Sequence, residues 1–456
     1  MDANGAEIRY AYDERSNIIA ITDALGNATR YEYDAFGNKV KETAPDGSSY
    51  SLQYDAHNNL IQLTDQRGGV TRYEYDAHNR LVRQTNPDGG VIAYTYNDAG
   101  QVLTVTDPLG HVTAYEYDGV DLVRSTDPNG NATSCAYDEQ HRLVSTTDAL
   151  GNTTAFAYDE RDNLTSVTFA DGTSFSYEYD KVGDLISQTD ALGNVTRFEY
   201  DALRQLVKTT YPDGSESTSG YDHSGNLVSA VDALGGEAAA SYDGRGNLLT
   251  LTDAEGNATR FAYDGLRQLV KTVYPDGSES ASGFDTGGNL VSATDANGNT
   301  ATATYDGRGR ILTLTDALGN VTSYTYDLNG NLVSERLADG SETRYTYDAC
   351  GRISSVTGGG ERVTYRYDAA GNLLCVGGPE GTTTYTYDCM SRVTSLTEPD
   401  GSYTQYRYDL AGRLIEKTDM AGVVSSYEWD GCGNLLLYTD TAGGYTAYYY
   451  DKAALT

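Results

Sequence analysis

Residues 326 to 348 read YDLNGNLVSERLADGSETRYTYD and contain one complete repeating unit of the chain. The stretch from Asp327 to Gly330 predicts a tight turn. An aspartate at the first position can accept hydrogen bonds from nearby backbone amides, and glycine readily takes the positive φ needed at the exit. The same D-x-x-G pattern follows the tyrosine at Asp34 to Gly37. We call the turn after each tyrosine the first turn.

A second turn follows about ten residues after the first. It takes the form T-D-x-x-G, as at Thr315, Asp316 and Gly319, or P-D-G, as at Pro275 to Gly277. Turn signals this close together leave room only for short antiparallel strands. Each unit therefore predicts a β-hairpin, joined to the next hairpin by the second turn.

A tyrosine followed by aspartate recurs every 21 residues, or 20 at three intervals, from Tyr12 to Tyr450, giving 22 copies of the motif. Asn97 replaces the aspartate once, whereas Phe284 and Trp429 replace the tyrosine. These exchanges indicate that the position needs a flat aromatic ring more than a phenolic hydroxyl. Periodicity of this length is typical of repeat proteins, whose hairpins gain stability from their neighbours.

The predicted strands alternate with period 2. In Asn27 to Tyr33, Thr29, Tyr31 and Tyr33 share one face and Arg30 and Glu32 the other. We therefore predict one aromatic face and one solvated face, with the tyrosines of neighbouring hairpins stacked into a ladder across the sheet. The representative ladder residues are Tyr31, Tyr33, Tyr73, Tyr75, Tyr115, Tyr117, Tyr345, Tyr347, Tyr406 and Tyr408. The representative turn residues are Asp34, Gly37, Asp327, Gly330, Asp316 and Gly319.

Residues 200–262 and 263–325 form an internal duplication of three repeats. An odd number of duplicated hairpins argues against pairing into four-stranded propeller blades, because later hairpins would fall out of phase. No change of period marks a boundary, so we expect residues 1–456 to form one continuous array. A turn motif at residues 2–5 lies in mid-pattern, which suggests a piece of a longer array.

The formal net charge of −34 argues against binding to nucleic acid. The sequence contains no run of about 18 apolar residues, so it predicts no membrane span. Calcium binding at the acidic turns is an alternative, but one aspartate per turn supplies few of the 6–8 oxygens that calcium takes. We predict no metal, no cofactor and no catalytic residue, because the carboxylates recur in nearly every copy and the five cysteines have no paired spacing.

The unit Y-x-Y-D-x-x-G-N-L-x-x-x-T-D-x-x-G, clear at Tyr326 to Leu332 and at Tyr367 to Leu373, resembles the YD repeat of the Rhs family. That family includes bacterial polymorphic toxins, toxin-complex components, wall-associated proteins and teneurins. The resemblance spans almost the whole chain. It implies an all-β array of about 22 hairpins in a spirally wound continuous sheet. It also implies that the sheet forms a shell wall.

The resemblance implies a structural, non-enzymatic function, in which the shell encapsulates or presents a C-terminal toxin or effector. The partner would be that enclosed domain or the rest of a parent chain, exported as a secreted or cell-surface protein. No region resembles the family's self-cleavage motif. The alternative is an extracellular carbohydrate- or cell-surface-binding module that recognises a glycan or a receptor, since tyrosine faces can stack on sugar rings.

Overall fold

The computed structural model describes residues 7–450. The turn motif at residues 2–5 and Asp451 of the last motif lie outside the described residues. Within residues 7–450 the fold is all-β, with 43 strands and no helix. The chain falls into two compact units, residues 1–110 with 238–362 (unit 1) and residues 111–237 with 363–456 (unit 2).

Most strands have five or six residues, as expected from the turn spacing. The strands of unit 1 are β1 (Arg9–Tyr12), β2 (Ile18–Thr22), β3 (Ala28–Tyr33), β4 (Lys39–Thr43), β5 (Ser49–Tyr54), β6 (Leu60–Thr64), β7 (Val70–Tyr75), β8 (Leu81–Thr85), β9 (Val91–Tyr96), β10 (Val102–Thr106), β23 (Glu237–Tyr242), β24 (Leu248–Thr252), β25 (Ala258–Tyr263), β26 (Leu269–Val273), β27 (Glu279–Phe284), β28 (Leu290–Thr294), β29 (Thr300–Tyr305), β30 (Ile311–Thr315), β31 (Val321–Tyr326), β32 (Leu332–Arg336), β33 (Glu342–Tyr347) and β34 (Ile353–Gly358).

The strands of unit 2 repeat the same pattern, and β23 and β35 each cross the boundary between the units. They are β11 (Val112–Asp118), β12 (Asp121–Thr126), β13 (Ala132–Tyr137), β14 (Leu143–Thr147), β15 (Thr153–Tyr158), β16 (Leu164–Thr168), β17 (Ser174–Tyr179), β18 (Leu185–Thr189), β19 (Val195–Tyr200), β20 (Leu206–Thr210), β21 (Glu216–Tyr221), β22 (Leu227–Val231), β35 (Glu361–Tyr367), β36 (Leu373–Gly378), β37 (Gly381–Tyr387), β38 (Val393–Thr397), β39 (Tyr403–Tyr408), β40 (Leu414–Asp419), β41 (Val424–Trp429), β42 (Leu435–Thr439) and β43 (Tyr445–Ala447).

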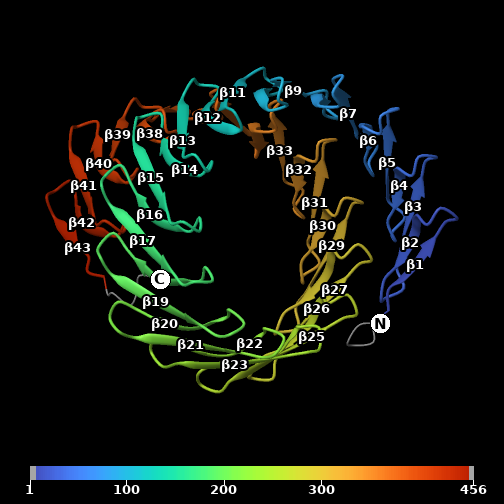
Figure 1. Cartoon of the computed structure of the whole chain (residues 1–456). Coiled ribbons are helices and arrows are strands. Elements are labelled where there is room, and N and C mark those ends of the chain that lie inside the picture. The colour runs from blue at the N-terminus through green and yellow to red at the C-terminus, as the bar shows by residue number, and fades with distance from the viewer. Residues whose placement is uncertain (1–6, 451–456) are drawn as a thin grey trace. The chain divides into compact units, whose positions relative to one another are not determined.

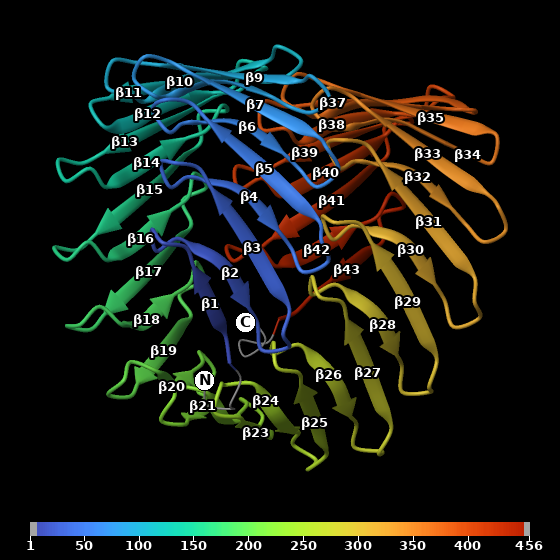
Figure 2. The same ribbon diagram turned by 90° about the vertical axis from the view of Figure 1, so that its right-hand side faces the viewer.

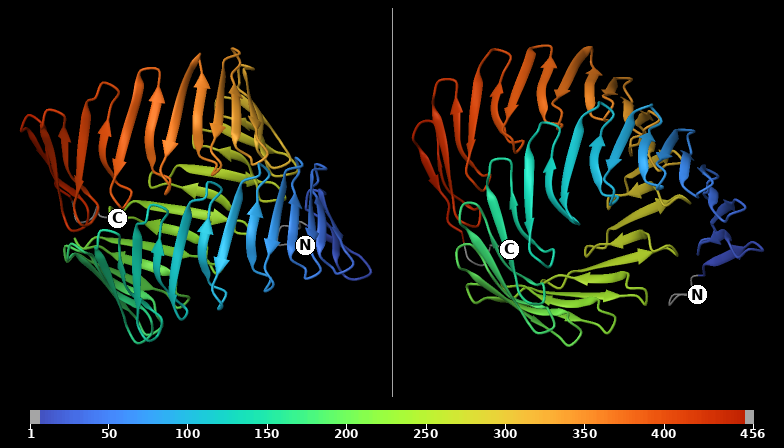
Figure 3. Two further views of the ribbon diagram at one scale, coloured as in Figure 1. Left: turned by 90° about the horizontal axis from the view of Figure 1, so that it is seen from above. Right: turned by 45° about the horizontal axis from the view of Figure 1, so that its top comes forward.

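Within each unit, strands that follow one another in the chain pair antiparallel, as β3 does with β4 and β4 with β5. Figure 1 labels the strands in chain order, and Figure 2 shows the blue strands of unit 1 as a row of successive hairpins. The hairpins of unit 2 form similar rows, from teal to green and from orange to red in Figure 3. The predicted two strands per repeat are thus confirmed.

Each hairpin carries a β-bulge at its motif aromatic. In the β3–β4 hairpin, Glu32 pairs with Lys41 but Tyr33 pairs with Lys39, so one residue of β4 is left over. The same shift recurs at Tyr347, which pairs with Ile353 while Thr346 pairs with Ser355. A bulge increases local twist and interrupts the backbone ladder, so the carbonyls next to it need other donors.

The array is one strand layer thick, and the described residues include no buried hydrophobic side chain. In β3 and β33 the tyrosines are half-buried and alternate with exposed residues such as Glu32 and Thr346. The predicted alternation of faces is therefore present. The tyrosines are less covered than core aromatics, however, because the described strands form a single layer.

Candidate functional site at the tyrosine and aspartate turns

The first turn is a closed five-residue loop held by its aspartate. Oδ1 of Asp34 accepts the amides of Phe36 at 2.8 Å and Asn38 at 2.9 Å, and Oδ2 accepts the Asn38 side-chain amide at 3.0 Å. Gly37 donates its amide to the Asp34 carbonyl and has φ 89°. Glycine takes this positive φ without a steric penalty.

The second turn uses the same geometry. Oδ1 of Asp316 accepts the amides of Leu318 and Asn320, and Oδ2 accepts the Asn320 side-chain amide at 2.7 Å. Gly319 has φ 84° and Gly330, which closes the first turn of Asp327, has φ 98°. The Asn320 side chain, followed by its backbone amide, lowers the pKa of Asp316. Turn carboxylates of this type are stabilised as anions by the turn itself.

Among residues 7–450, eight first turns place a residue other than glycine at the positive-φ position. Several of these side chains bond the fifth residue of the previous turn. Asn58 accepts from the Asn38 side chain at 2.9 Å, and Arg204 donates to Asp184 through Nε at 2.8 Å. A left-handed conformation is strained for such residues. These bonds between neighbouring hairpins offset that strain.

The motif tyrosine forms a second connection between hairpins. The hydroxyl of Tyr347 donates to the carbonyl of Leu332 at 2.7 Å, and that of Tyr33 donates to the carbonyl of Ile18 at 2.9 Å. In both cases the acceptor is the first residue of the preceding strand, 15 residues earlier, beside the bulge. We call this bond the tyrosine bridge. It also forms at Tyr54, Tyr75, Tyr96, Tyr137, Tyr158, Tyr200, Tyr221, Tyr305, Tyr326, Tyr387, Tyr408 and Tyr450.

The tyrosine bridge corrects the interpretation that the position needs a flat aromatic ring more than a phenolic hydroxyl. Trp429 keeps the bridge, because its indole Nε1 donates to the carbonyl of Leu414 at 2.8 Å. Phe284 has no donor, so the structure shows one exchange that preserves the bond and one that cannot. The signal was in the sequence, since tyrosine and tryptophan share a ring with a polar donor.

The expectation that rings of neighbouring hairpins stack directly on one another is also corrected. The partner opposite Tyr31 is Glu42, and the partner opposite Tyr345 is Val356, so a strand with other side chains separates successive tyrosines. Among the described residues, rings pair at Tyr10 with Tyr12, Phe169 with Phe175, and Tyr427 with Tyr438 at 5.3 Å, and these ring–ring pairs include none of the ten representative ladder residues. The expected ladder is instead a row of rings joined through hydroxyls and intervening strands.

Arginine at the fifth turn position makes a further connection that sequence reasoning missed. Arg80 donates through Nε to Oδ2 of Asp76 at 2.7 Å and through Nη1 to the carbonyl of Asn97 at 2.9 Å. Its guanidinium lies 4.9 Å from the ring centroid of Tyr96, in the next hairpin. Asparagine at this position, as in Asn38, also caps its aspartate. The alternation of asparagine and arginine at the fifth position was the available signal.

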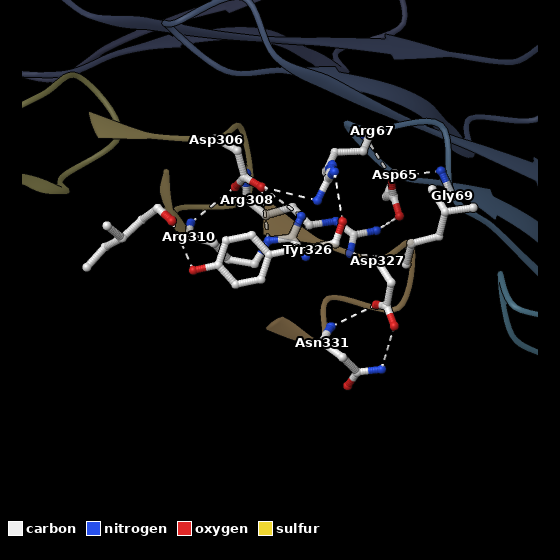
Figure 4. A network of polar contacts seen from close by, with 11 residues as sticks. Asp65, Arg67, Gly69, Asp306, Arg308, Arg310, Tyr326, Asp327 and Asn331 are labelled. Atoms are coloured by element: carbon white, nitrogen blue, oxygen red, sulfur yellow. Dashed lines mark hydrogen bonds and ion pairs between the residues drawn. The ribbon is translucent and has the colours of Figure 1, made fainter. Parts of the chain in front are cut away.

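In unit 1, second turns of residues 1–110 face first turns of residues 238–362, as Figure 4 shows for the turns at 65–69 and 306–310. Asp65 is only 9% exposed and forms an ion pair with Arg308, while Arg67 lies 3.8 Å from Oδ2 of Asp306. Arg67 also donates to the carbonyl of Tyr326 at 3.2 Å. We call this contact between the two rows of turns the junction of unit 1. It joins residues about 240 positions apart.

Unit 2 has an equivalent junction. Asn129 of a second turn donates to Oδ2 of Asp368 in a first turn at 2.9 Å. Arg413, the fifth residue of another first turn, lies 3.5 Å from Oδ2 of Asp171 in a second turn. In both units, therefore, second turns of the earlier segment meet first turns of the later segment.

A cysteine and an aspartate take part in the junction of unit 1. The Cys350 thiol donates to Oδ2 of Asp107 at 3.1 Å across the junction of unit 1. Burial, followed by that carboxylate, raises the pKa of the thiol to about 11, so it stays protonated at neutral pH. All five cysteines are free. Between residues 7 and 450 no group of three His, Cys, Asp or Glu side chains is placed to hold a metal ion.

The repeat pattern matches a known family. The RHS Repeat profile matches residues 12–49, 54–91, 96–132, 119–153, 137–174, 179–216 and 242–279, just over half of the chain. The chain belongs to the RHS repeat family. The Teneurin YD-shell profile matches residues 291–425 and 335–454. The predicted family is thus confirmed, and the RHS repeats and the YD-shell match together extend over most of the array.

Solved structures share the fold of this RHS repeat chain. TcdB2-TccC3 covers 96% of the chain with a TM-score of 0.71 at 15% identity, and the chain covers 35% of it. TcdB2-TccC3-Cdc42 covers 95% with a TM-score of 0.59 at 17% identity and 29% coverage of that chain. TcdB2-TccC3 without its hypervariable C-terminal region covers 95%, with a TM-score of 0.51, 14% identity and 37% coverage in return.

The chain thus spans about a third of the length of these solved structures. At this identity the likeness concerns the fold, an antiparallel strand array of the toxin-complex YD type. No curated protein sequence matches the chain. Within the part of the chain that the structure covers, no helix is long and apolar enough to cross a membrane.

Proposed function

We propose that this chain is a non-catalytic wall segment of a larger Rhs/YD-repeat protein, and that the wall encloses or presents a C-terminal effector or toxin domain. The observation that carries the proposal is the half-buried tyrosine face of a sheet one strand thick. Strands such as β3 and β33 keep their tyrosines only partly covered. A face of this kind gains stability by contact with another polypeptide.

Two further observations support the proposal. The fold likeness extends over almost the whole chain, and one of the similar structures is described as lacking a hypervariable C-terminal region. The repeated side chains make contacts that hold hairpins together, such as the tyrosine bridge of Tyr347 and the turn bonds of Asp34. A wall segment needs such contacts in every repeat. The continuous array of residues 1–456, exported to the cell surface or beyond, is part of this proposal.

The test is limited proteolysis of the full-length polypeptide that carries this array. We expect its C-terminal region to resist protease while the same region expressed alone is digested. Tyr347→Ala weakens the wall and should speed that digestion, whereas Glu32→Ala, on the exposed face, should leave it unchanged. Equal digestion rates for the enclosed and isolated region would refute the proposal.

The half-exposed tyrosines also allow the second candidate, recognition of a glycan or cell-surface receptor. Tyrosine rings can stack on sugar rings, and residues such as Tyr403 are 39% exposed. A glycan array probed with the folded chain tests this function. Binding that is lost in Tyr403→Ala, with the thermal unfolding of the chain unchanged, would favour it over the wall.

A further inference from the structure

Two identical hexapeptides of unit 1 differ in how far their leucines are covered. TDALGN occurs at residues 22–27 and again at residues 315–320, in second turns of the same geometry. Leu25 is 54% exposed, whereas Leu318 is 89% exposed. Since the local sequence is the same, the difference comes from what packs against each turn.

The cover over Leu25 is a first turn of the later segment. A Cβ atom built on Gly265 would lie 3.3 Å from Cδ2 of Leu25 and 3.4 Å from Cβ of Ala24, so the backbone of this first turn lies against the second turn of Leu25. This contact belongs to the junction of unit 1. Leu318 has the same surface but is exposed. The second turns of residues 253–340 therefore resemble the second turns at the junction but lie open to solvent, and we call them the second-turn edge.

First turns show the same contrast. The internal duplication places YDGLR at residues 263–267 and YDALR at residues 200–204. Leu266 is half-buried at the junction of unit 1, whereas Leu203 of unit 2 is 70% exposed. In unit 1 itself, Phe36 holds the position equivalent to Leu266 and is 83% exposed. The first turns of the earlier segment therefore resemble the first turns at the junction but lie open to solvent, and we call them the first-turn edge.

We propose that these two uncovered edges bind each other between two copies of this chain, head to tail. The first-turn edge of one copy, marked by Phe36, would dock on the second-turn edge of the other, marked by Leu318. The junction already pairs these two kinds of edge within each unit, so the contact continues an interface that exists inside the chain. This inference does not depend on whether an effector is enclosed.

The sizes of the side chains fit this docking. The residue after the first-turn aspartate lies close to the opposite turn at the junction, and it is glycine at Gly265 and Gly307, alanine at Ala349 and leucine at Leu328. On the uncovered edge of unit 1 the same position is alanine three times in succession, at Ala35, Ala56 and Ala77. Small side chains there allow the backbones of two turns to approach.

Charge opposes the docking and gives it a measurable signature. Two copies with a formal net charge of −34 each repel one another, and salt screens this repulsion. Association through apolar side chains such as Leu318 and Phe36 should therefore strengthen with added salt. A contact made chiefly of ion pairs between the copies would weaken instead.

A head-to-tail contact uses two different surfaces and leaves a free edge at each end of the complex. Sedimentation velocity of the whole chain, from about 1 µM to about 100 µM in low and high salt, tests this. We expect species heavier than the 49.2 kDa monomer that increase with concentration and salt. A chain that stays monomeric throughout this range, or that associates less in salt, would overturn the proposal.

Paired variants make the test specific. Leu318→Asp with Leu337→Asp alters the second-turn edge of unit 1, and Phe36→Asp with His57→Asp alters its first-turn edge; all four side chains are exposed. Each variant should be monomeric, but a mixture of the two should form a one-to-one complex that grows no further, because one intact edge of each kind remains. Association of either variant alone, or no complex in the mixture, would overturn the proposal.

Circular dichroism establishes that both variants are folded. Should either fail to fold, serine at the same positions replaces aspartate.

Discussion

The hydroxyl of Tyr347 donates a 2.7 Å hydrogen bond to the backbone carbonyl of Leu332, the residue that pairs with Tyr326 of the previous hairpin. One side chain thus connects two successive repeats at the point where the bulge interrupts the ladder. Because the same bond recurs along both units, the motif tyrosine acts as a donor as well as an apolar ring. Stability of the array depends on such contacts between neighbours.

Removing only the hydroxyl of Tyr347 should cost less than removing the ring. We expect Tyr347→Phe to lower the free energy of unfolding by about 0.5–1.5 kcal/mol, the range of one hydrogen bond. Tyr347→Ala should cost about 2–4 kcal/mol. Urea unfolding and hydrogen exchange of the β32 and β33 amides measure both. Glu32→Ala is the control, and an equal effect there would mean that the two faces are wrongly assigned.

Phe284 offers the converse change. Phe284→Tyr adds a hydroxyl at the one motif position without a donor, where the equivalent acceptor is the carbonyl of Leu269, 15 residues earlier. We expect a gain of up to about 1 kcal/mol, seen as slower hydrogen exchange in β26 and β27. Phe261→Tyr, on the same face but outside the motif, is the control. No gain at position 284 would show that the bridge depends on more than the donor.

Arg80 tests the arginine connection between hairpins. Arg80→Asn keeps a residue type that caps first turns elsewhere but loses the bond to the Asn97 carbonyl and the contact with the Tyr96 ring. We expect a loss of about 0.5–1.5 kcal/mol in thermal unfolding, with faster hydrogen exchange in β9. Asn38→Ala, which removes the cap itself, is the comparison. Unchanged exchange in β9 would contradict the connection.

The junction of unit 1 should depend on Arg308. Arg308→Gln leaves the nearly buried Asp65 without its ion-pair partner, at a cost of about 1–3 kcal/mol. Hydrogen exchange should rise at residues 65–69 and 306–310 together. Arg344→Gln breaks an ion pair with Glu342 of the same strand, where the arginine is well exposed, and should change little. Independent exchange of the two turns would mean that the ion pair does not couple them.

Acid should open the turns only well below the usual range for aspartate. The backbone amide of Arg80, followed by its side chain, lowers the pKa of Asp76 to about 2 from 3.8. A lowered folded-state pKa means that the contribution of Asp76 is present above pH 3.8 and is lost as the pH falls through about 2. An NMR titration of Asp76 with exchange of the His78 amide measures this. Asp76→Asn removes the dependence, and a midpoint near 4 would contradict the turn bonds.

Much of the local structure could be predicted from residues. Asp34 and Gly37 indicate a turn because one accepts amides and the other tolerates positive φ, and both roles are observed. The tyrosine bridge could have been inferred from Trp429 but was obscured by Phe284. The left-handed conformation of Arg204, held at φ 64° by its bond to Asp184, could not have been predicted, since no local rule places arginine in that conformation.

The 21-residue period by itself determined the hairpins, their two turns and the family, because these depend on contacts within about one repeat. Only the tertiary structure decided which turns meet. Asp65 contacts Arg308, and Leu25 is 54% exposed whereas Leu318 is 89% exposed, although the two leucines lie in identical hexapeptides. The physical reason is that nearly equivalent repeats carry the same local information. Which repeats pack together is set by the twist accumulated over many strands, and the sequence of a single repeat does not encode that twist.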